Sequence, residues 1–236
     1  MTALLERLAA EPRRAALFLD FDGVLSPIVP RPDNAFVPEA TRRQLERLTS
    51  RYALVAVVSG RAGDDVRTRV GIPGITIVGT HGLELDPAAD EWRERIAAFA
   101  DAARWPDTER KGLAVTFHYR RAENEESAVA AIEDIAAQAR SQGLVARSGR
   151  KMLEVLPPVQ ANKGTAVTAL LARSGLRRAL VAGDDTTDLD AFRALDGLEL
   201  AVRVAVATPE SPPELRESAD IVVTTTEELV ALLESL

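Results

Sequence analysis

Residues 15–23 read AALFLDFDG, and this stretch decides the expected fold. Five apolar residues in a row, 15–19, are typical of a strand that is buried on both faces of a parallel sheet. Two carboxylates, Asp20 and Asp22, follow at once, and Gly23 opens a turn. Because ligands of open parallel sheets bind beyond the carboxyl ends of the strands, the stretch predicts chemistry where the first strand ends.

Apolar runs and helical patterns repeat a strand–helix–strand order further along the chain. We expect helices over 38–49 and 61–70 and strands over 52–58 and 75–78. The same pattern resumes later, with helices over 163–174, 188–195 and 227–236 and strands over 179–182, 200–204 and 220–223. Strands that alternate with helices at this spacing predict an α/β fold with one parallel sheet.

The middle of the chain has a different pattern. Helices are expected over 90–104 and 123–142, and strands over 113–119, 144–146 and 152–156. These elements form a small α+β unit, which Pro157 and Pro158 close. We therefore expect a core of residues 1–87 and 157–236 with an inserted cap of residues 88–156.

The composition excludes several classes of protein. With 46% hydrophobic residues the chain is expected to fold, and without cysteine it has neither disulfides nor thiolate metal sites. A net charge of −7 without a basic block argues against nucleic acid as a partner. No apolar run approaches the ~18 residues of a membrane span, and the N-terminal stretch has no signal-peptide pattern. We expect a cytoplasmic protein with no membrane partner. The sequence leaves the oligomeric state open and favours a monomer.

Polar residues follow three of the expected strands. Crowded carboxylates repel one another, and a hard cation such as Mg²⁺, which prefers oxygen ligands, relieves that repulsion. The alternative is that each residue only caps a helix, but capping does not need clustering across separate strands. The residues in question are Asp20 and Asp22 after 15–19, Ser59, Gly60 and Arg61 after 52–58, and Asp184, Asp185 and Asp188 after 179–182.

These motifs resemble those of the haloacid-dehalogenase-like phosphohydrolases, in the order of that family. Asp20-Phe21-Asp22 resembles the first motif, Ser59 the second and Lys163 the third, and GDDTTD at 183–188 resembles the fourth. The resemblance implies a Rossmann-like core and a phosphatase that depends on Mg²⁺.

The resemblance also implies catalytic roles. Asp20 would attack the phosphate as a nucleophile and form an aspartyl-phosphate. Asp22 would protonate the leaving oxygen and then activate water. Lys163 would neutralise the phosphoryl oxygens, and the Ser59 hydroxyl and the Gly60 amide would bind one of them.

A metal site is implied by the same motifs. Asp20 and Asp184 would ligate Mg²⁺, and Asp22 would contribute its backbone carbonyl. Either Asp185 or Asp188 would supply a further ligand or support the others.

Motifs in and just before the expected cap resemble those of the trehalose-6-phosphate phosphatases within that family. GTHGLE at 79–84 resembles their G-x-H-G-x-E element, and 109–111, 118–120 and 150–154 resemble their cap motifs. All three lysines of the chain fall in the motif segments, whereas Leu189 departs from the Glu that is usual there. The alternative is a solvated network of surface charges. The residues that would bind the substrate are Gly60, Arg61, His81, Glu109, Lys111, Arg120 and Glu154.

The resulting expectation is a phosphatase of trehalose 6-phosphate, a small-molecule sugar phosphate. The alternatives are a phosphatase of sucrose phosphate or of a glycosyl-phosphoglycerate, a phosphotransferase or mutase, and a receiver-like signalling module. A receiver-like module needs only ~120 residues, and its acidic pair and phosphorylated Asp lie at different strand ends. Two features argue against a receiver-like module: Asp20 and Asp22 follow the same strand, and the chain has an inserted cap.

Overall fold

The computed structural model describes residues 3–149, 151–209 and 211–236. The chain divides into two compact units. The core unit extends to Leu85 and resumes from Ala161 to Leu236, and the inserted unit is Asp86–Gln160. The expected boundaries, after residues 87 and 156, lie a few residues away from these divisions.

The core unit is built on a parallel sheet. Within the described residues this sheet has six strands in the order β10-β9-β8-β1-β2-β3. The strand β1 lies in the middle and is buried along its whole length. Leu17 and Leu19 face one side of the sheet, and Ala16 and Phe18 face the other. The strands are β1 (Ala15–Leu19), β2 (Leu54–Val58), β3 (Thr76–Val78), β8 (Arg178–Gly183), β9 (Leu200–Val206) and β10 (Ile221–Val223).

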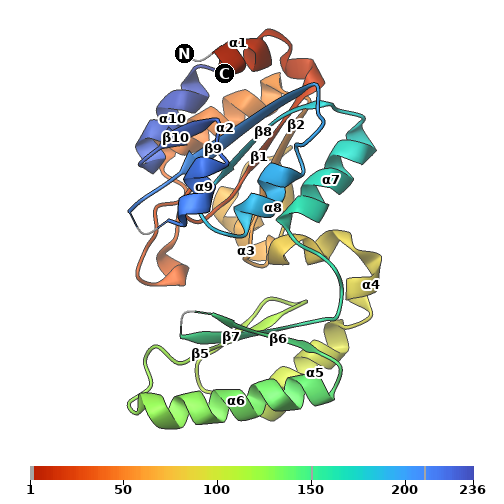
Figure 1. Cartoon of the computed structure of the whole chain (residues 1–236), viewed down its shortest axis with the longest axis vertical. Helices are drawn as coiled ribbons and strands as arrows, with labels where there is room; N and C mark the ends of the chain where they lie inside the picture. The colour runs from red at the N-terminus through yellow and green to blue at the C-terminus, as the bar shows by residue number, and fades with distance from the viewer. Residues whose placement is uncertain (1–2, 150, 210) are drawn as a thin grey trace. The chain divides into compact units, whose positions relative to one another are not determined.

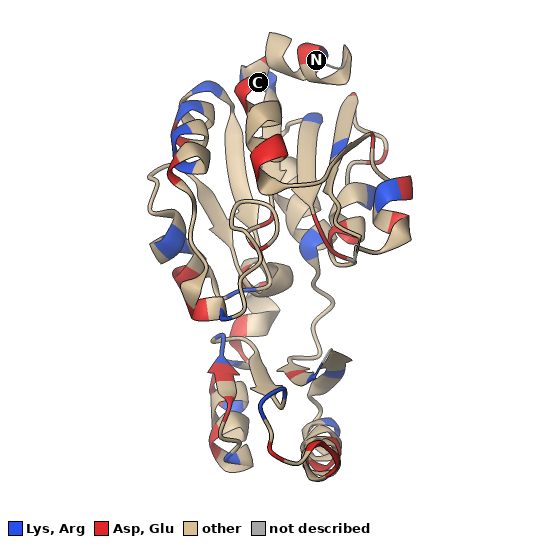
Figure 2. Ribbon diagram, turned by 90° about the vertical axis from the view of Figure 1, so that its left-hand side faces the viewer, with Lys and Arg blue, Asp and Glu red and all other residues tan. Residues whose placement is uncertain are grey.

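Helices cover both faces of this sheet, as Figure 1 shows. One face packs against α1 (Ala3–Ala10), α2 (Glu39–Arg51), α3 (Gly63–Val70) and α10 (Thr226–Glu234). The other face packs against α7 (Lys163–Ser174), α8 (Asp188–Arg193) and α9 (Pro213–Glu217). In Figure 2 the strands of the core sheet are almost free of charge, and the charged residues lie on the helices and loops. This three-layer α/β architecture confirms the predicted fold class.

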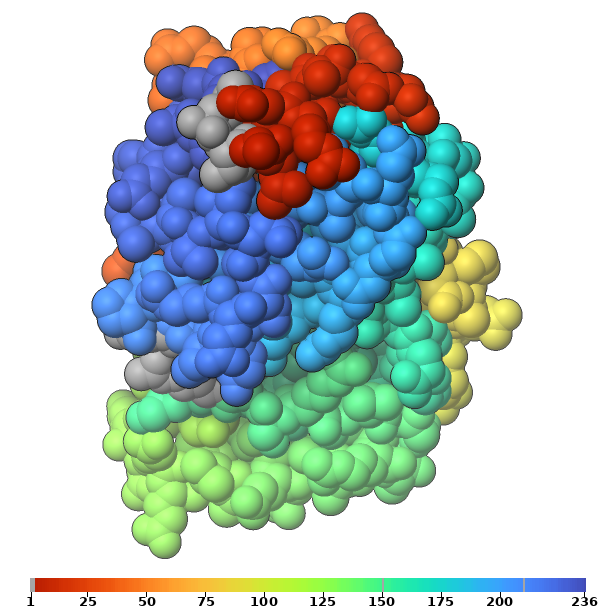
Figure 3. Space-filling model, turned by 45° about the horizontal axis from the view of Figure 1, so that its top comes forward, coloured from red at the N-terminus to blue at the C-terminus, as the bar shows by residue number. Residues whose placement is uncertain are grey.

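The N-terminal helix α1 was not expected from the sequence. Figure 3 shows it, in red, against the blue C-terminal part of the core unit. Arg178, at the beginning of β8, holds it there by donating to the carbonyl of Arg7 at 2.5 Å and by pairing with Glu11. These contacts lie at the amino end of the strands, at the opposite edge from the predicted chemistry.

The inserted unit has an antiparallel sheet in the order β4-β5-β7-β6. Its apolar core lies between this sheet and α5 and α6. The short strand β4 was not expected, and β6 extends beyond the predicted 144–146. The elements are α4 (Pro87–Asp90), α5 (Arg93–Ala103), β4 (Thr108–Arg110), β5 (Val115–His118), α6 (Glu125–Ser141), β6 (Val145–Gly149) and β7 (Met152–Leu156).

Short 3₁₀ turns connect several of these elements, namely η1 (Pro12–Arg14), η2 (Pro32–Asn34) and η3 (Thr80–Leu85). Among the described residues, no helix combines the length and the apolar character that crossing a membrane would need.

Candidate active site

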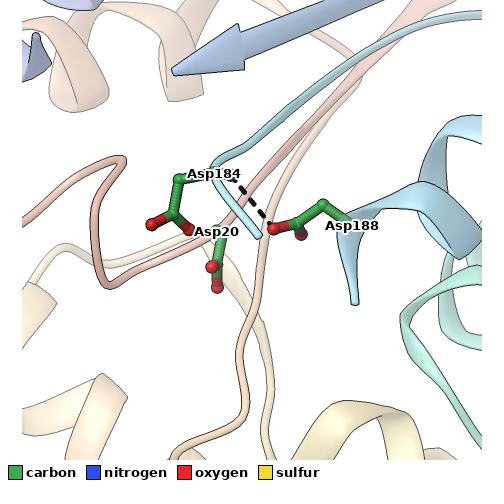
Figure 4. A group of neighbouring side chains, drawn as sticks. All are labelled: Asp20, Asp184 and Asp188. Carbon is green, nitrogen blue, oxygen red and sulfur yellow. Dashed lines mark hydrogen bonds between the residues drawn. The ribbon is translucent and has the colours of Figure 1, made fainter. Parts of the chain in front are cut away.

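Three carboxylates meet at the carboxyl edge of the core sheet. Asp20 follows β1, Asp184 follows β8 and Asp188 begins α8 (Figure 4). Each contributes an oxygen to a group in which these atoms lie within 4.8 Å of one another. Asp20 and Asp188 are buried, with 7% and 1% of their surface exposed. The parallel arrangement of β1 and β8 therefore brings together acidic residues that are far apart in the sequence.

Lys163 places a buried cation against two of these carboxylates. Its Nζ lies 2.9 Å from Asp20 Oδ2 and 2.7 Å from Asp188 Oδ1. It is the first residue of α7, where the helix dipole disfavours a cation. Burial also opposes its charge, but the neighbouring carboxylates outweigh that effect and raise its pKa. Lys163 therefore stays charged at this site.

Asp188 organises the turn that follows β8. While Lys163 donates to Oδ1, Oδ2 accepts from the backbone amides of Asp184 at 3.1 Å and Asp185 at 3.2 Å. Gly183 leaves room for this arrangement, because a Cβ there would lie 2.3 Å from the Cβ of Asp188. Both Asp188 oxygens thus support the turn that carries Asp184.

The charge of this site is unbalanced in a way that suits a divalent cation. Burial, with smaller contributions from Asp20 and Asp188, raises the pKa of Asp184 to about 9. Burial also raises the pKa of Asp20 to about 7, although Lys163 opposes the rise. Three ionised carboxylates against one ammonium would leave two negative charges. An all-oxygen donor set with that excess charge fits a hard cation such as Mg²⁺.

Gly23 leaves the space that Asp184 occupies in this group. Its φ is +73°, and a Cβ there would lie 2.0 Å from Asp184 Oδ2. A side chain at position 23 would therefore displace the Asp184 carboxylate from the group.

Asp22 and Asp185, both expected near the metal, have side chains outside this group. Arg61 donates to both oxygens of Asp22, from Nε at 2.7 Å and from Nη2 at 2.9 Å. The guanidinium also pairs with Asp65 at 3.1 Å and lies over the Phe21 ring. Asp185 is exposed, and its Oδ1 accepts from the amide of Thr186. Arg61 thus holds the Asp22 carboxylate away from the group, and Asp185 is exposed outside it.

Ser59, Gly60 and His81 lie together beyond β2 and β3. The Ser59 hydroxyl is buried and accepts from the Arg61 amide at 3.2 Å. The His81 ring lies against Gly60, where a Cβ would come within 2.5 Å of the ring. The structure thus brings three of the predicted phosphate- and substrate-binding residues into one pair of loops.

In the inserted unit, Glu109, Lys111 and Glu154 share one face of the antiparallel sheet. Glu109 is in register with Thr116, and Thr116 is in register with Glu154. Lys111 Nζ lies 3.0 Å from Glu154 Oε1, and this pair is largely buried. The opposite face carries Phe117 and Val155 and packs against the helices. The strand alternation therefore places the predicted charges on the side away from the apolar core.

Arg120 does not join this set. It is exposed in the turn after β5, and no ion pair links it to the other predicted residues within the part of the chain that is described. Arg150, which begins one of the predicted motifs, lies outside the described residues.

His118 is a residue that the sequence singled out only as part of a motif. Its Nε2 lies 3.0 Å from Glu109 Oε2. Alternation along β5 indicates this position, because residues 116 and 118 of a strand lie on the same face. Glu84 likewise received no role from the sequence, and its carboxylate accepts from the amides of Gly63 and Gly79.

Comparisons with known proteins agree with this architecture. A family model of trehalose-phosphatases matches residues 18–108 and 106–221. A trehalose-phosphate phosphatase of Mycobacterium ulcerans is 33% identical, over 80% of this chain and 54% of that protein. A probable trehalose-phosphate phosphatase D of Arabidopsis thaliana is 29% identical, over 79% of this chain and 58% of that protein. The chain thus spans about half the length of these relatives.

Other relatives are much longer. An uncharacterized glycosyl hydrolase of Mycobacterium tuberculosis is 36% identical over 81% of this chain, but the match covers only 16% of that protein.

Solved structures share the fold over nearly the whole chain. A trehalose-6-phosphate phosphatase related protein has a TM-score of 0.76 and 25% identity, covering 93% of this chain and 95% of that one. The C-terminal domain of the Candida albicans trehalose-6-phosphate phosphatase has a TM-score of 0.73 and 23% identity, covering 98% and 94%. A haloacid dehalogenase-like hydrolase of Bacteroides thetaiotaomicron has a TM-score of 0.66 and 14% identity, covering 93% and 98%.

The parallel core sheet and the inserted α+β unit give the chain a haloacid-dehalogenase-like fold. Within that class, the chain belongs to the trehalose-phosphatase family. Both results confirm the resemblance that the sequence motifs indicated.

Proposed function

We propose that this protein is a Mg²⁺-dependent phosphatase that hydrolyses trehalose 6-phosphate to trehalose and phosphate. The observation that carries the proposal is the convergence of Asp20, Asp184 and Asp188 with Lys163 at the carboxyl edge of the core sheet. The excess negative charge of the three carboxylates suits a divalent cation, and that cation together with Lys163 would attract the phosphate.

Asp20 is the proposed nucleophile. One of its carboxylate oxygens forms a bond to phosphorus while the bond from phosphorus to the sugar oxygen breaks, which leaves an aspartyl-phosphate. Lys163 lies close enough to Asp20 to stabilise the charge on the phosphoryl oxygens. Mg²⁺ held by Asp20 and Asp184 would supply further charge neutralisation.

Asp22 is the proposed acid and base. It gives a proton to the leaving sugar oxygen and then takes one from the water that attacks the aspartyl-phosphate and releases phosphate. Both oxygens of Asp22 accept from Arg61 in this structure, and each oxygen keeps a second lone pair that can carry the transferred proton.

The sugar is the proposed partner of the inserted unit. Its polar sheet face offers Glu109, Lys111 and Glu154, and charged groups of this kind form strong hydrogen bonds to sugar hydroxyls. The relatives named for trehalose phosphate support this sugar over the sucrose phosphate and glycosyl-phosphoglycerate alternatives. In this proposal the inserted unit selects the substrate, and the core unit carries out the hydrolysis.

A phosphate-release screen tests the proposal. Wild-type protein is assayed with trehalose 6-phosphate, sucrose 6-phosphate, a glucosyl-phosphoglycerate and glucose 6-phosphate, each in Mg²⁺ and in EDTA. We expect the highest kcat/KM for trehalose 6-phosphate and no activity in EDTA. Preference for another substrate would overturn the sugar assignment, and activity that persists in EDTA would overturn the metal assignment.

A further inference from the structure

Glu84 joins two segments that lie beyond neighbouring strands. Its Oε1 accepts from the amide of Gly63 at 2.7 Å, and its Oε2 accepts from the amide of Gly79 at 3.1 Å. Gly63 is the first residue of α3, and Gly79 directly follows β3. One carboxylate therefore connects the loop after β2 to the loop after β3.

The helix α3 has no capping side chain of its own. Ala62 occupies its N-cap position and offers no side-chain hydrogen bond. The first amides of a helix need acceptors, and the helix dipole favours a negative charge at that end. Glu84, which lies 21 residues further along the chain, supplies both the acceptor and the negative charge.

Glycines allow the close approach. A Cβ at Gly63 would lie 2.2 Å from Glu84 Oε2. A Cβ at Gly79 would lie 2.4 Å from Glu84 Oε1 and 2.1 Å from the Gly63 nitrogen. Both glycines are therefore required for the carboxylate to reach the two amides.

The same two loops are joined through their backbones. Thr80 donates to the Arg61 carbonyl at 2.7 Å, and His81 donates to the Ser59 carbonyl at 2.9 Å. Together with Glu84, these bonds fix the position of the Ser59–Gly60–Arg61 segment relative to the His81 ring.

The loop that carries His81 is strained. Thr80 and His81 have φ of 50° and 54°, a region that residues with a side chain rarely adopt, and Gly82 follows with φ of 101°. Strain of this kind persists only where surrounding contacts hold it, and it gathers at functional sites. The hydrogen bonds of Glu84 and of the Thr80 and His81 amides are such contacts.

We infer that Glu84 is a positioning residue that holds the Ser59–Gly60–Arg61 segment and His81 in the arrangement that receives the phosphoryl group. The inference rests on the proposed function, because it assigns that segment to phosphate. Glu84 acts through the backbone of these loops and does not itself touch the substrate.

Glu84→Ala tests the inference, and Glu228→Ala is its matched control. Glu228 uses the same chemistry at the beginning of α10, where its carboxylate accepts from the Thr224 amide at 2.6 Å. We expect Glu84→Ala to lower kcat/KM about 10- to 100-fold, since a small misplacement of the phosphate is costly. It should also raise the inhibition constant of inorganic phosphate about tenfold. Glu228→Ala should leave both values within about twofold of the wild type.

Glu84→Gln serves as a milder variant if Glu84→Ala is unstable. Glutamine keeps one acceptor oxygen but turns an NH₂ group toward the second amide, so its losses should lie between those of the wild type and Glu84→Ala. The inference would be overturned if folded Glu84→Ala or Glu84→Gln protein bound inorganic phosphate as well as the wild type does.

Imidazole NMR separates this inference from the proposed function. The chain has only two histidines, so each ring signal can be assigned to His81 or His118. In Glu84→Ala the His81 signal should shift or broaden while the His118 signal stays in place, and neither should change in Glu228→Ala. An unchanged His81 signal overturns the positioning role, whatever sugar phosphate the protein hydrolyses. If the wild type does not hydrolyse trehalose 6-phosphate, but Glu84→Ala still shows the His81 shift and the weaker phosphate binding, only the sugar assignment is overturned.

Discussion

The three carboxylates of the site differ in the contacts they already make. Asp188 accepts from Lys163 and from two backbone amides, and Asp20 shares the same lysine. The pKa of Asp184 is raised to about 9, because burial and its two acidic neighbours oppose its charge. Asp20 and Asp184 are therefore the residues that gain most from a cation, whereas Asp188 fixes the geometry.

Replacement of the nucleophile should abolish activity without unfolding the protein. We expect Asp20→Asn to release no measurable phosphate from trehalose 6-phosphate, because an amide cannot attack phosphorus as a carboxylate does. Lys163 keeps Asp188 as a partner, so the melting temperature should stay close to that of the wild type. Phosphate release and thermal unfolding measure the two effects, and appreciable turnover by folded variant protein would contradict the assignment.

Replacement of Asp22 should depend on the leaving group. Asp22→Asn cannot protonate a sugar alkoxide, whereas an aryl phosphate needs less help from an acid. We expect kcat/KM, which reports the steps up to departure of the leaving group, to fall at least tenfold more for trehalose 6-phosphate than for an aryl phosphate. Equal losses of kcat/KM on both substrates would contradict the role of Asp22 as the acid.

At the scale of the elements, the sheet of the inserted unit separates two functions by strand alternation. Phe117 and Val155 fill the apolar core, while Glu154 and Thr116 occupy the opposite face. The Lys111–Glu154 pair lies on that polar face with little exposure, so loss of one partner leaves the other buried without its counterion.

The polar face of this sheet should control the choice of sugar. Glu154→Ala should lower kcat/KM for trehalose 6-phosphate about 10- to 1000-fold and hardly change that for a small aryl phosphate. Asp101→Ala is the control, since it breaks the Arg110–Asp101 pair on the helix side of the sheet. An unchanged ratio of the two kcat/KM values in Glu154→Ala would mean that these charges form only a surface network.

The sequence predicts those helices and strands whose apolar and polar pattern lies within one short stretch of residues. The apolar run of β1 and the acidic residues after it indicate both a buried strand and its ligand-binding end. The strand β4 escapes prediction because its three residues are polar and form a strand only by pairing with β5. The Asp22–Arg61 pair and the Glu84 contacts escape it for a similar reason. The Asp22–Arg61 pair joins side chains 39 residues apart, and Glu84 accepts from an amide 21 residues away. No rule of sequence spacing selects partners at these separations.

At the scale of the whole molecule, we expect the acidic group to make the stability of the protein depend on metal and on pH. The pKa values of Asp20 and Asp184 are raised to about 7 and about 9 in the folded state. The unfolded values lie near 3.9, so the metal-free folded protein holds protons that the unfolded chain releases. This contribution to stability is fully present below about pH 4, falls as the pH rises, and is lost once the pH has passed the folded-state values of about 7 and about 9.

Mg²⁺ should reverse this loss, because a cation binds the ionised carboxylates and releases their protons. We expect the rise in melting temperature on adding Mg²⁺ to be larger at pH 8.5 than at pH 6. Thermal unfolding in Mg²⁺ and in EDTA measures it, and Asp184→Asn should show little rise at either pH. A rise that is equal at both pH values, or larger at pH 6, would contradict the assignment of these carboxylates to the metal.

The most direct test of the account is the search for phosphate on Asp20. Protein is mixed with Mg²⁺ and trehalose 6-phosphate carrying a radioactive phosphate, quenched in acid within one turnover, and mapped by peptide. Asp22→Asn is run beside the wild type with a radioactive aryl phosphate, whose leaving group needs little help from an acid, because slower attack by water should then let the aspartyl-phosphate accumulate. We predict label on the peptide that contains Asp20, and none in Asp20→Asn. Turnover without labelled protein in both the wild type and Asp22→Asn, or label on another residue, would contradict the central claim.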